Sequence, residues 1–198
     1  MWLAFGLALL LAACSTSVPS IAHLSPDAKI LAFGDSLTYG TGAGREQSYP
    51  AVLEHLTGRH VVNAGVPGEI TQQGLKRLPR LLDEVQPELL VLCHGGNDIL
   101  HKKDLDAAAD NLRQMIRAAQ SRNIAIVLIG VPKPGFLLSS ADFYEEIAQE
   151  FNIPYEGEIL ADIESETSLK ADTIHPNGNG YQVLAEAVFE LLKKSGAI

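Results

Sequence analysis

The sequence predicts an α/β fold in which one parallel sheet of five strands is covered by helices on both faces, giving three layers. Short apolar runs of the length of a buried strand occur at residues 30–33, 60–63, 89–93 and 124–129, with a weaker run at 153–155. Between them, apolar residues recur three and four positions apart, as on one face of a helix, at residues 49–56, 75–85, 105–119 and 143–151, with a last segment at 181–192. Strict alternation of strand and helix is typical of a parallel sheet with helices on both sides.

The amino-terminal stretch suits an export signal. Residues 1–13 carry no charged side chain and are too short to span a bilayer, yet they have the length of a signal h-region. They end in Leu11-Ala12-Ala13-Cys14, which resembles a bacterial lipobox, where the cysteine is acylated and becomes the new amino terminus. We therefore expect a signal peptide at 1–13, lipidation at Cys14, a Ser-, Pro- and Ala-rich tether at 14–28 and one domain at 29–198. A frayed apolar terminus with an incidental cysteine is the alternative.

The first predicted strand stops abruptly at Gly34-Asp35-Ser36. A buried strand that ends in a small-residue turn leaves its last side chain at the carboxyl edge of the sheet, where open α/β proteins bind ligands. Ser36 is therefore a candidate nucleophile. The alternative is that Asp35 or Ser36 only caps the turn that follows.

The loops after the second and third strands add possible hydrogen-bond donors at the same edge. Gly68 has no side chain, so its backbone N–H could approach an anion. Asn97 carries a neutral amide that could stabilise charge on a carbonyl oxygen. Each could equally be a simple turn residue. Cys93, at the end of the third apolar run, is expected to be a small buried core residue.

The loop after the fourth strand, residues 132–140, contains three consecutive apolar side chains, and these either line an acyl pocket or pack on the domain: Phe136, Leu137 and Leu138. Asp172 precedes His175 by three positions, just before the last predicted helix. A carboxylate at that spacing can reach the imidazole in one turn and fix its tautomer, so that the other ring nitrogen faces a serine. A solvated Asp and a surface His are the alternative.

Taken together, these blocks resemble the SGNH, or GDSL, hydrolase superfamily, in particular the subgroup of thioesterase I, lysophospholipase L1 and small arylesterases. The blocks are Gly34-Asp35-Ser36-Leu37-Thr38, Asn63-Ala64 through Gly68, Gly95-Gly96-Asn97-Asp98 and Asp172-Thr173-Ile174-His175-Pro176.

The resemblance implies a flavodoxin-like fold and a serine esterase that needs neither cofactor nor metal ion. It assigns Ser36 as nucleophile, His175 as base and Asp172 as the acid that orients it. The backbone N–H groups of Ser36 and Gly68 and the side chain of Asn97 would form the oxyanion hole. Glu69 and Ile70 depart from the Asp and Thr of thioesterase-like relatives.

The substrate is left open among short acyl esters, lysophospholipids, acyl thioesters and O-acetyl groups of cell-surface glycans. A flavodoxin-like nucleotide-binding module is disfavoured because Gly40-Thr41-Gly42-Ala43-Gly44 does not fit the dinucleotide pattern. A binding lipoprotein that keeps the fold without catalysis is a further alternative. His94, His101 and Asp104 are too loosely spaced to favour a metal site.

Composition sets the remaining expectations. A chain of 198 residues with 46% hydrophobic side chains suits one domain with a well-buried core. The formal charge of -9, without a Lys or Arg cluster, argues against a nucleic-acid partner. We expect a monomer that acts on a small acyl ester or lipid and is held in the bacterial cell envelope by Cys14. Ser15 favours the outer membrane, by resemblance to Gram-negative lipoproteins.

Overall fold

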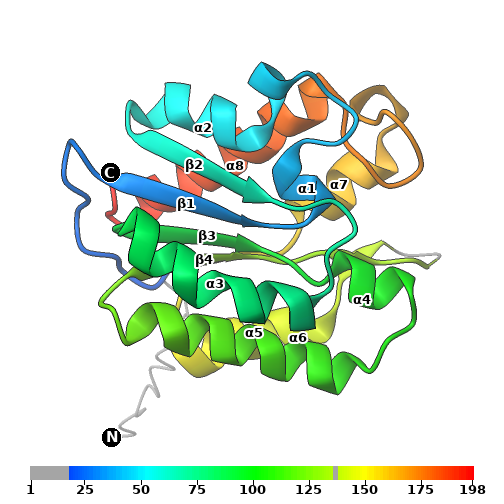
Figure 1. The fold of residues 1–198 in the computed structure, drawn as a ribbon. Helices are drawn as coiled ribbons and strands as arrows, with labels where there is room; N and C mark the ends of the chain where they lie inside the picture. The colour runs from blue at the N-terminus through cyan, green and yellow to red at the C-terminus, as the bar shows by residue number, and fades with distance from the viewer. Residues whose placement is uncertain (1–17, 136–137) are drawn as a thin grey trace, which may run out of the picture.

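A computed structural model of the chain describes residues 18–135 and 138–198 (Figure 1). Five parallel strands form one sheet in the order β2-β1-β3-β4-β7. Their bounds are Lys29–Gly34 for β1, His60–Gly65 for β2, Leu89–Cys93 for β3, Ala125–Ile129 for β4 and Tyr155–Glu156 for β7. The predicted α/β fold with a five-stranded parallel sheet is confirmed. β1 to β4 lie where apolar runs predicted them, whereas β7 begins only at Tyr155, the last residue of the weaker run at 153–155.

Helices cover both faces of this sheet, which completes the three layers (Figure 1). On one face lie α2 (Tyr49–Thr57) and α8 (Gly178–Lys194), which contact each other. On the other lie α3 (Thr71–Val85), α5 (Leu105–Gln120) and α6 (Asp142–Phe151). The central strand β3 is buried along its whole length because helices cover it from both sides, which explains its unbroken apolar sequence.

Several short elements lie outside the predicted strands and helices, because they are too brief to show a strand or helix pattern in the sequence. Two of them, α1 (Ser36–Tyr39) and α4 (Gly96–Leu100), begin just after β1 and β3. The others are α7 (Ile159–Ser165), the 3-10 turns η1 (Arg45–Gln47) and η2 (Thr167–Leu169), and the antiparallel pair β5 (Pro132–Lys133) and β6 (Ser139–Ser140).

The strand order places a crevice between β1 and β3. The chain leaves β1 for β2 on one side, then crosses to β3 on the other, so the two loops diverge at the carboxyl ends of these neighbours. Such a switch point is where open α/β sheets bind ligands.

Gly34 allows β1 to end tightly against β3. A Cβ atom built on Gly34 would lie 1.8 Å from the carbonyl oxygen of Cys93 and 2.4 Å from Oγ1 of Thr38. Only a residue without a side chain fits there, and it brings Asp35 and Ser36 to the crevice. Cys93 is fully buried, as expected.

Part of the expected tether packs on the domain. Among residues 18–28, the Ile21 amide donates to the carbonyl of Ser195 and the Leu24 amide to that of Ala197, both at 2.8 Å. The side chain of Leu24 is buried, so apolar contact as well as backbone pairing orders this segment before Lys29. Cys14 and the signal at 1–13 lie outside the described residues. In the described ranges no helix has both the length and the apolar character to cross a membrane.

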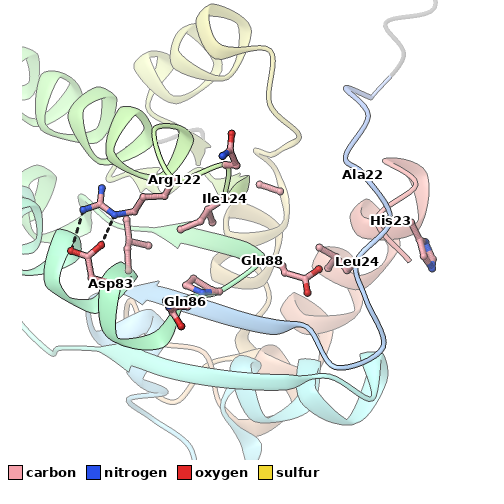
Figure 2. Close-up of a pocket in the computed structure, with 12 residues that line it drawn as sticks. Ala22, His23, Leu24, Asp83, Gln86, Glu88, Arg122 and Ile124 are labelled. Carbon is pink, nitrogen blue, oxygen red and sulfur yellow. Dashed lines mark hydrogen bonds and ion pairs between the residues drawn. The ribbon is translucent and has the colours of Figure 1, made fainter.

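The amino ends of β3 and β4 border a hollow of about 550 Å³ beside this segment (Figure 2). Arg122 and Asp83 form an ion pair at its side, with 2.7 Å between Nε and Oδ1. The hollow lies at the opposite edge of the sheet from Ser36, and none of the predicted site residues lines it.

Candidate active site

Ser36, His175 and Asp172 form a continuous hydrogen-bonded row. The hydroxyl Oγ of Ser36 lies 3.0 Å from Nε2 of His175, and Nδ1 of the same ring lies 2.8 Å from Oδ2 of Asp172. Ser36 opens α1 directly after β1, whereas His175 lies in the loop before α8. The fold thus joins two segments that are 139 positions apart.

A tight loop holds the His175 ring in this position. The second carboxylate oxygen of Asp172 accepts the backbone N–H groups of Ile174 at 2.9 Å and of His175 at 2.8 Å. The Ala171 amide donates to the carbonyl of His175 at 2.9 Å, which closes the loop. Asn177 then caps α8 by accepting the amides of Asn179 and Gly180.

These bonds keep Asp172 ionised. Burial acts to raise the pKa of its carboxyl, but the hydrogen bonds from the Ile174 amide, the His175 ring and the His175 amide outweigh that effect and lower the pKa to about 2. An ionised carboxylate accepts a proton-bearing Nδ1, so Nε2 of His175 offers its lone pair to the Ser36 hydroxyl. That is the tautomer a general base requires.

Asn97 lies in α4, beside Ser36 in the crevice, and is almost fully buried. Its Nδ2 donates to the carbonyl of Glu69 at 3.0 Å and makes a longer bond of 3.3 Å to Oδ2 of Asp35. The amide is therefore aimed by the loop after β2. Asp98 ties the same two loops together, because its carboxylate accepts the amide and the hydroxyl of Thr71, both at 2.8 Å.

Gly68 lies in the turn between β2 and α3, closed by the bond from the Glu69 amide to the Val66 carbonyl at 3.1 Å. Its φ of +78° is in the left-handed region that favours glycine. Within the described residues its own amide donates to no protein acceptor. The structure thus joins Asn97 to this turn through Glu69, while Gly68 itself is exposed and does not line the cavity at Ser36.

A buried ionic cluster behind this turn was not predicted. Glu69 accepts Nε of Arg77 at 2.9 Å and Nε2 of His94 at 3.1 Å. Nδ1 of His94 accepts the Gly95 amide at 2.9 Å, which places the ring proton on Nε2. Arg77 lies 4.1 Å from the centre of the Phe33 ring.

The same contacts decide the charge of Glu69. Burial acts to raise the pKa of its carboxyl, but the hydrogen bonds from His94 and Arg77 prevail and lower it. The signal that could have revealed the cluster is Arg77, which follows Glu69 by eight positions and lies in the predicted helix after the Gly68 turn. Both ring nitrogens of His94 are hydrogen-bonded, one to Glu69 and one to the Gly95 amide. Among the described residues, no group of three or more His, Cys, Asp or Glu side chains is arranged to hold a metal ion.

A cavity of about 390 Å³ opens beside Ser36 and His175. Its walls come from the first, third and fourth strand ends, from α7 and from the His175 loop, and are largely apolar: Leu37, Leu100, Val131, Pro132, Pro134, Leu138 and Ile174. Leu138 thus lines the pocket, one of the two alternatives for the loop at 132–140. Phe136 and Leu137 lie outside the described residues.

Residues 32–183 of the chain match the GDSL-like Lipase/Acylhydrolase family. The chain belongs to this family. It is 30% identical over 169 residues, 79% of each chain, to a protein of Escherichia coli K12 named thioesterase 1/protease 1/lysophospholipase L1. It is also 28% identical to the esterase TesA of Pseudomonas aeruginosa, across 94% of this chain and 98% of that one.

Solved structures of family members agree with the fold. The crystal structure of TesA superposes with a TM-score of 0.74 at 27% identity, covering 83% of this chain and 98% of that one. The SGNH-hydrolase family esterase AlinE4 gives a TM-score of 0.67 at 32% identity, covering 85% and 96%. The resemblance read from the motifs is thus confirmed, and the chain is an esterase- or thioesterase-like hydrolase of the GDSL family.

Proposed function

We propose that the protein is a serine esterase that hydrolyses acyl esters through an acyl-enzyme on Ser36. The observation that supports this most directly is the row of hydrogen bonds from Asp172 through His175 to Ser36. In this proposal the neutral His175 ring takes the Ser36 proton as the hydroxyl oxygen attacks the ester carbonyl. His175 then returns the proton to the leaving alcohol, and water releases the acid by the same two steps.

When Ser36 attacks, negative charge develops on the ester carbonyl oxygen and must be stabilised by hydrogen-bond donors. We assign the Ser36 and Gly68 backbone N–H groups and the Asn97 amide to this role. The exposed Gly68 amide is available for it, and the 3.3 Å contact of Asn97 with Asp35 is long enough for an oxyanion to replace. The bond of Asn97 to the Glu69 carbonyl would stay in place and keep the side chain aimed.

The names of the relatives and the shape of the cavity together suggest which esters the protein prefers. The relatives are named as a thioesterase and lysophospholipase, an arylesterase from Vibrio mimicus and an esterase. A largely apolar cavity of about 390 Å³ supports an acyl or alcohol group of modest length. We propose carboxylic esters with short chains as the preferred substrates.

Labelling by a fluorophosphonate tests this function. Wild-type protein should be modified at Ser36, as read by peptide mass spectrometry, and should hydrolyse p-nitrophenyl butyrate. Ser36→Ala should lose both properties, whereas Ser121→Ala, an exposed serine at the end of α5, should keep them. A Ser36→Ala variant that retained more than a few per cent of the activity would remove Ser36 from its assigned role.

We also propose that Cys14 anchors the protein in the cell envelope. The support is the lipobox-like sequence Leu11-Ala12-Ala13-Cys14. Cys14→Ser should move the protein from the membrane fraction to the soluble fraction or leave its precursor uncleaved. Mass spectrometry of the mature protein from cells decides the matter, since an unmodified Met1 would contradict the anchor.

A further inference from the structure

One titratable residue that lines the cavity beside Ser36 has no role in the proposed catalytic steps. The titratable residues that line the cavity are Asp35, His175 and Glu164. Asp35 accepts the Leu37 amide and Asn97, and His175 is bonded to Ser36 and Asp172. In the described part of the chain, the Glu164 carboxyl receives no hydrogen bond.

Glu164 lies near the end of α7 and is half-buried. Lys170 is the neighbouring cation, but its ammonium donates to the backbone carbonyl of Glu164, at 2.6 Å, and not to the carboxylate. Burial raises the pKa of Glu164 to about 7, and the nearby Lys170 charge acts in the opposite direction without offsetting it. A carboxyl placed this way is stabilised in its ionised form by any donor that comes within hydrogen-bond distance.

The apolar surroundings of the Glu164 carboxyl affect which esters bind well in the cavity. Most of the cavity wall is apolar, so an alkyl chain that fills the cavity leaves the Glu164 carboxyl group without a hydrogen-bond partner. A buried acceptor that loses water and gains no donor carries an energetic penalty. An ester bearing a donor avoids that penalty, so the cavity distinguishes the two kinds of substrate.

Resting on the proposed esterase function, we propose that Glu164 is a specificity residue that accepts a hydrogen bond from a hydroxyl or ammonium group of the ester. The preferred substrates then carry a hydrogen-bond donor away from the scissile carbonyl, and plain alkyl esters are poorer. Glu164 takes no part in the covalent steps.

Isosteric ester pairs test this. On the alcohol side, 2-(dimethylamino)ethyl butyrate, protonated at neutral pH, is compared with 3-methylbutyl butyrate. On the acyl side, p-nitrophenyl 3-hydroxybutyrate is compared with p-nitrophenyl 3-methylbutyrate. In at least one pair, kcat/KM of the wild type should favour the donor-bearing ester about tenfold, the value of one hydrogen bond to a charged group. The favoured pair also shows whether the recognised donor is an ammonium group on the alcohol side or a hydroxyl group on the acyl side.

Three variants make the result specific. Glu164→Leu should bring that ratio close to one and improve kcat/KM for the alkyl ester, and Glu164→Gln should give an intermediate ratio. Asp162→Asn removes an exposed carboxylate from the same helix and should leave the ratio unchanged. Thermal unfolding of each variant verifies that it is folded.

A wild-type ratio near one in both pairs, or a ratio that Glu164→Leu leaves intact, overturns the inference while hydrolysis of p-nitrophenyl butyrate still supports the esterase. If the wild type hydrolyses no ester and is not labelled by the phosphonate, the proposed function itself fails, and this inference falls with it.

Discussion

Nε2 of His94 lies 3.1 Å from Oε2 of Glu69, and both side chains are buried at the back of the turn that contains Gly68. The carbonyl of Glu69 also accepts the Asn97 amide. One residue therefore connects the ionic cluster to a proposed oxyanion donor. The cluster holds the turn without touching the substrate cavity, since neither Glu69 nor His94 lines it.

Glu69→Gln should weaken both the fold and the catalysis. The variant leaves Arg77 bonded to the carbonyls of Gly34 and Ala64 but without a charged partner. The free energy of unfolding, measured in urea, should therefore fall by about 2 to 3 kcal/mol, somewhat less than for a fully buried pair. We expect kcat to fall about tenfold with KM little changed, because Asn97 is aimed less well. Glu84→Gln, which breaks the exposed pair with Arg80, should alter stability by less than about 0.5 kcal/mol. Equal stability of the Glu69 and Glu84 variants would contradict this account.

The loss of kcat should separate the role of Asp172 from that of Asn97. Hydrogen bonds lower the pKa of Asp172 to about 2, so its carboxylate stays ionised across the working pH range. Asp172→Asn keeps the shape of the side chain but removes the charge that accepts Nδ1 of His175, and it should lower kcat for p-nitrophenyl butyrate by roughly 10⁴-fold. Asn97→Ala removes one proposed oxyanion donor and should lower kcat by roughly 100- to 1000-fold. A smaller loss for Asp172→Asn than for Asn97→Ala would mean that the two assignments are wrong.

Glu164 should make stability depend on pH. Burial raises the pKa of Glu164 from 4.5 to about 7, so between these values the folded protein keeps a proton that the unfolded chain releases. The contribution to stability is therefore present at low pH and is lost as pH rises through this window. Glu164→Gln has no proton to lose, so its unfolding free energy relative to the wild type should increase from pH 5 to pH 8 in urea titrations. Asp162→Asn is the control, and a difference that stays constant for Glu164→Gln would refute the prediction.

Gly34→Ala should disrupt the junction of β1 and β3. The added methyl group would meet the Cys93 carbonyl at 1.8 Å, and neither strand can move away without breaking the sheet. We expect the free energy of unfolding to fall by more than about 4 kcal/mol, or the variant to yield no soluble protein. Gly58→Ala places a methyl group in open space at a φ of +65° and should cost only about 1 to 2 kcal/mol. Similar losses for the two variants, measured by urea unfolding, would show that close packing at Gly34 is not decisive.

The strands and long helices could be predicted because their sequence pattern reflects burial over several residues. The run Leu89–Cys93 is apolar throughout since helices cover β3 on both faces, and α5 repeats its apolar positions over four turns. Ser36, Asp172 and His175 could be singled out because strand ends in a parallel sheet share one edge and because Asp172 and His175 are only three positions apart. The structure brings these three together at hydrogen-bond distance.

The parts that could not be predicted depend on contacts between distant segments. The short helix α7 has too few turns for a clear period, so nothing in the sequence placed Glu164 beside the cavity. The ionic cluster joins Glu69, Arg77 and His94 from three separate segments, and a buried charge cannot be told from an exposed one by residue type. The segment before Lys29 looked like a linker by composition, yet Leu24 is buried against the domain.

The hydrogen bond between Ser36 and His175 spans 139 positions of the chain. His175 lies just before α8, the last helix, and α8 packs on α2 near the start of the domain. Contacts of such long range close only after the loops between them are ordered. A polypeptide still leaving the ribosome or crossing a membrane would therefore carry its nucleophile without its base, and hydrolysis would begin only once the final helix had docked. In refolding experiments, the return of activity should accordingly trail the return of secondary structure.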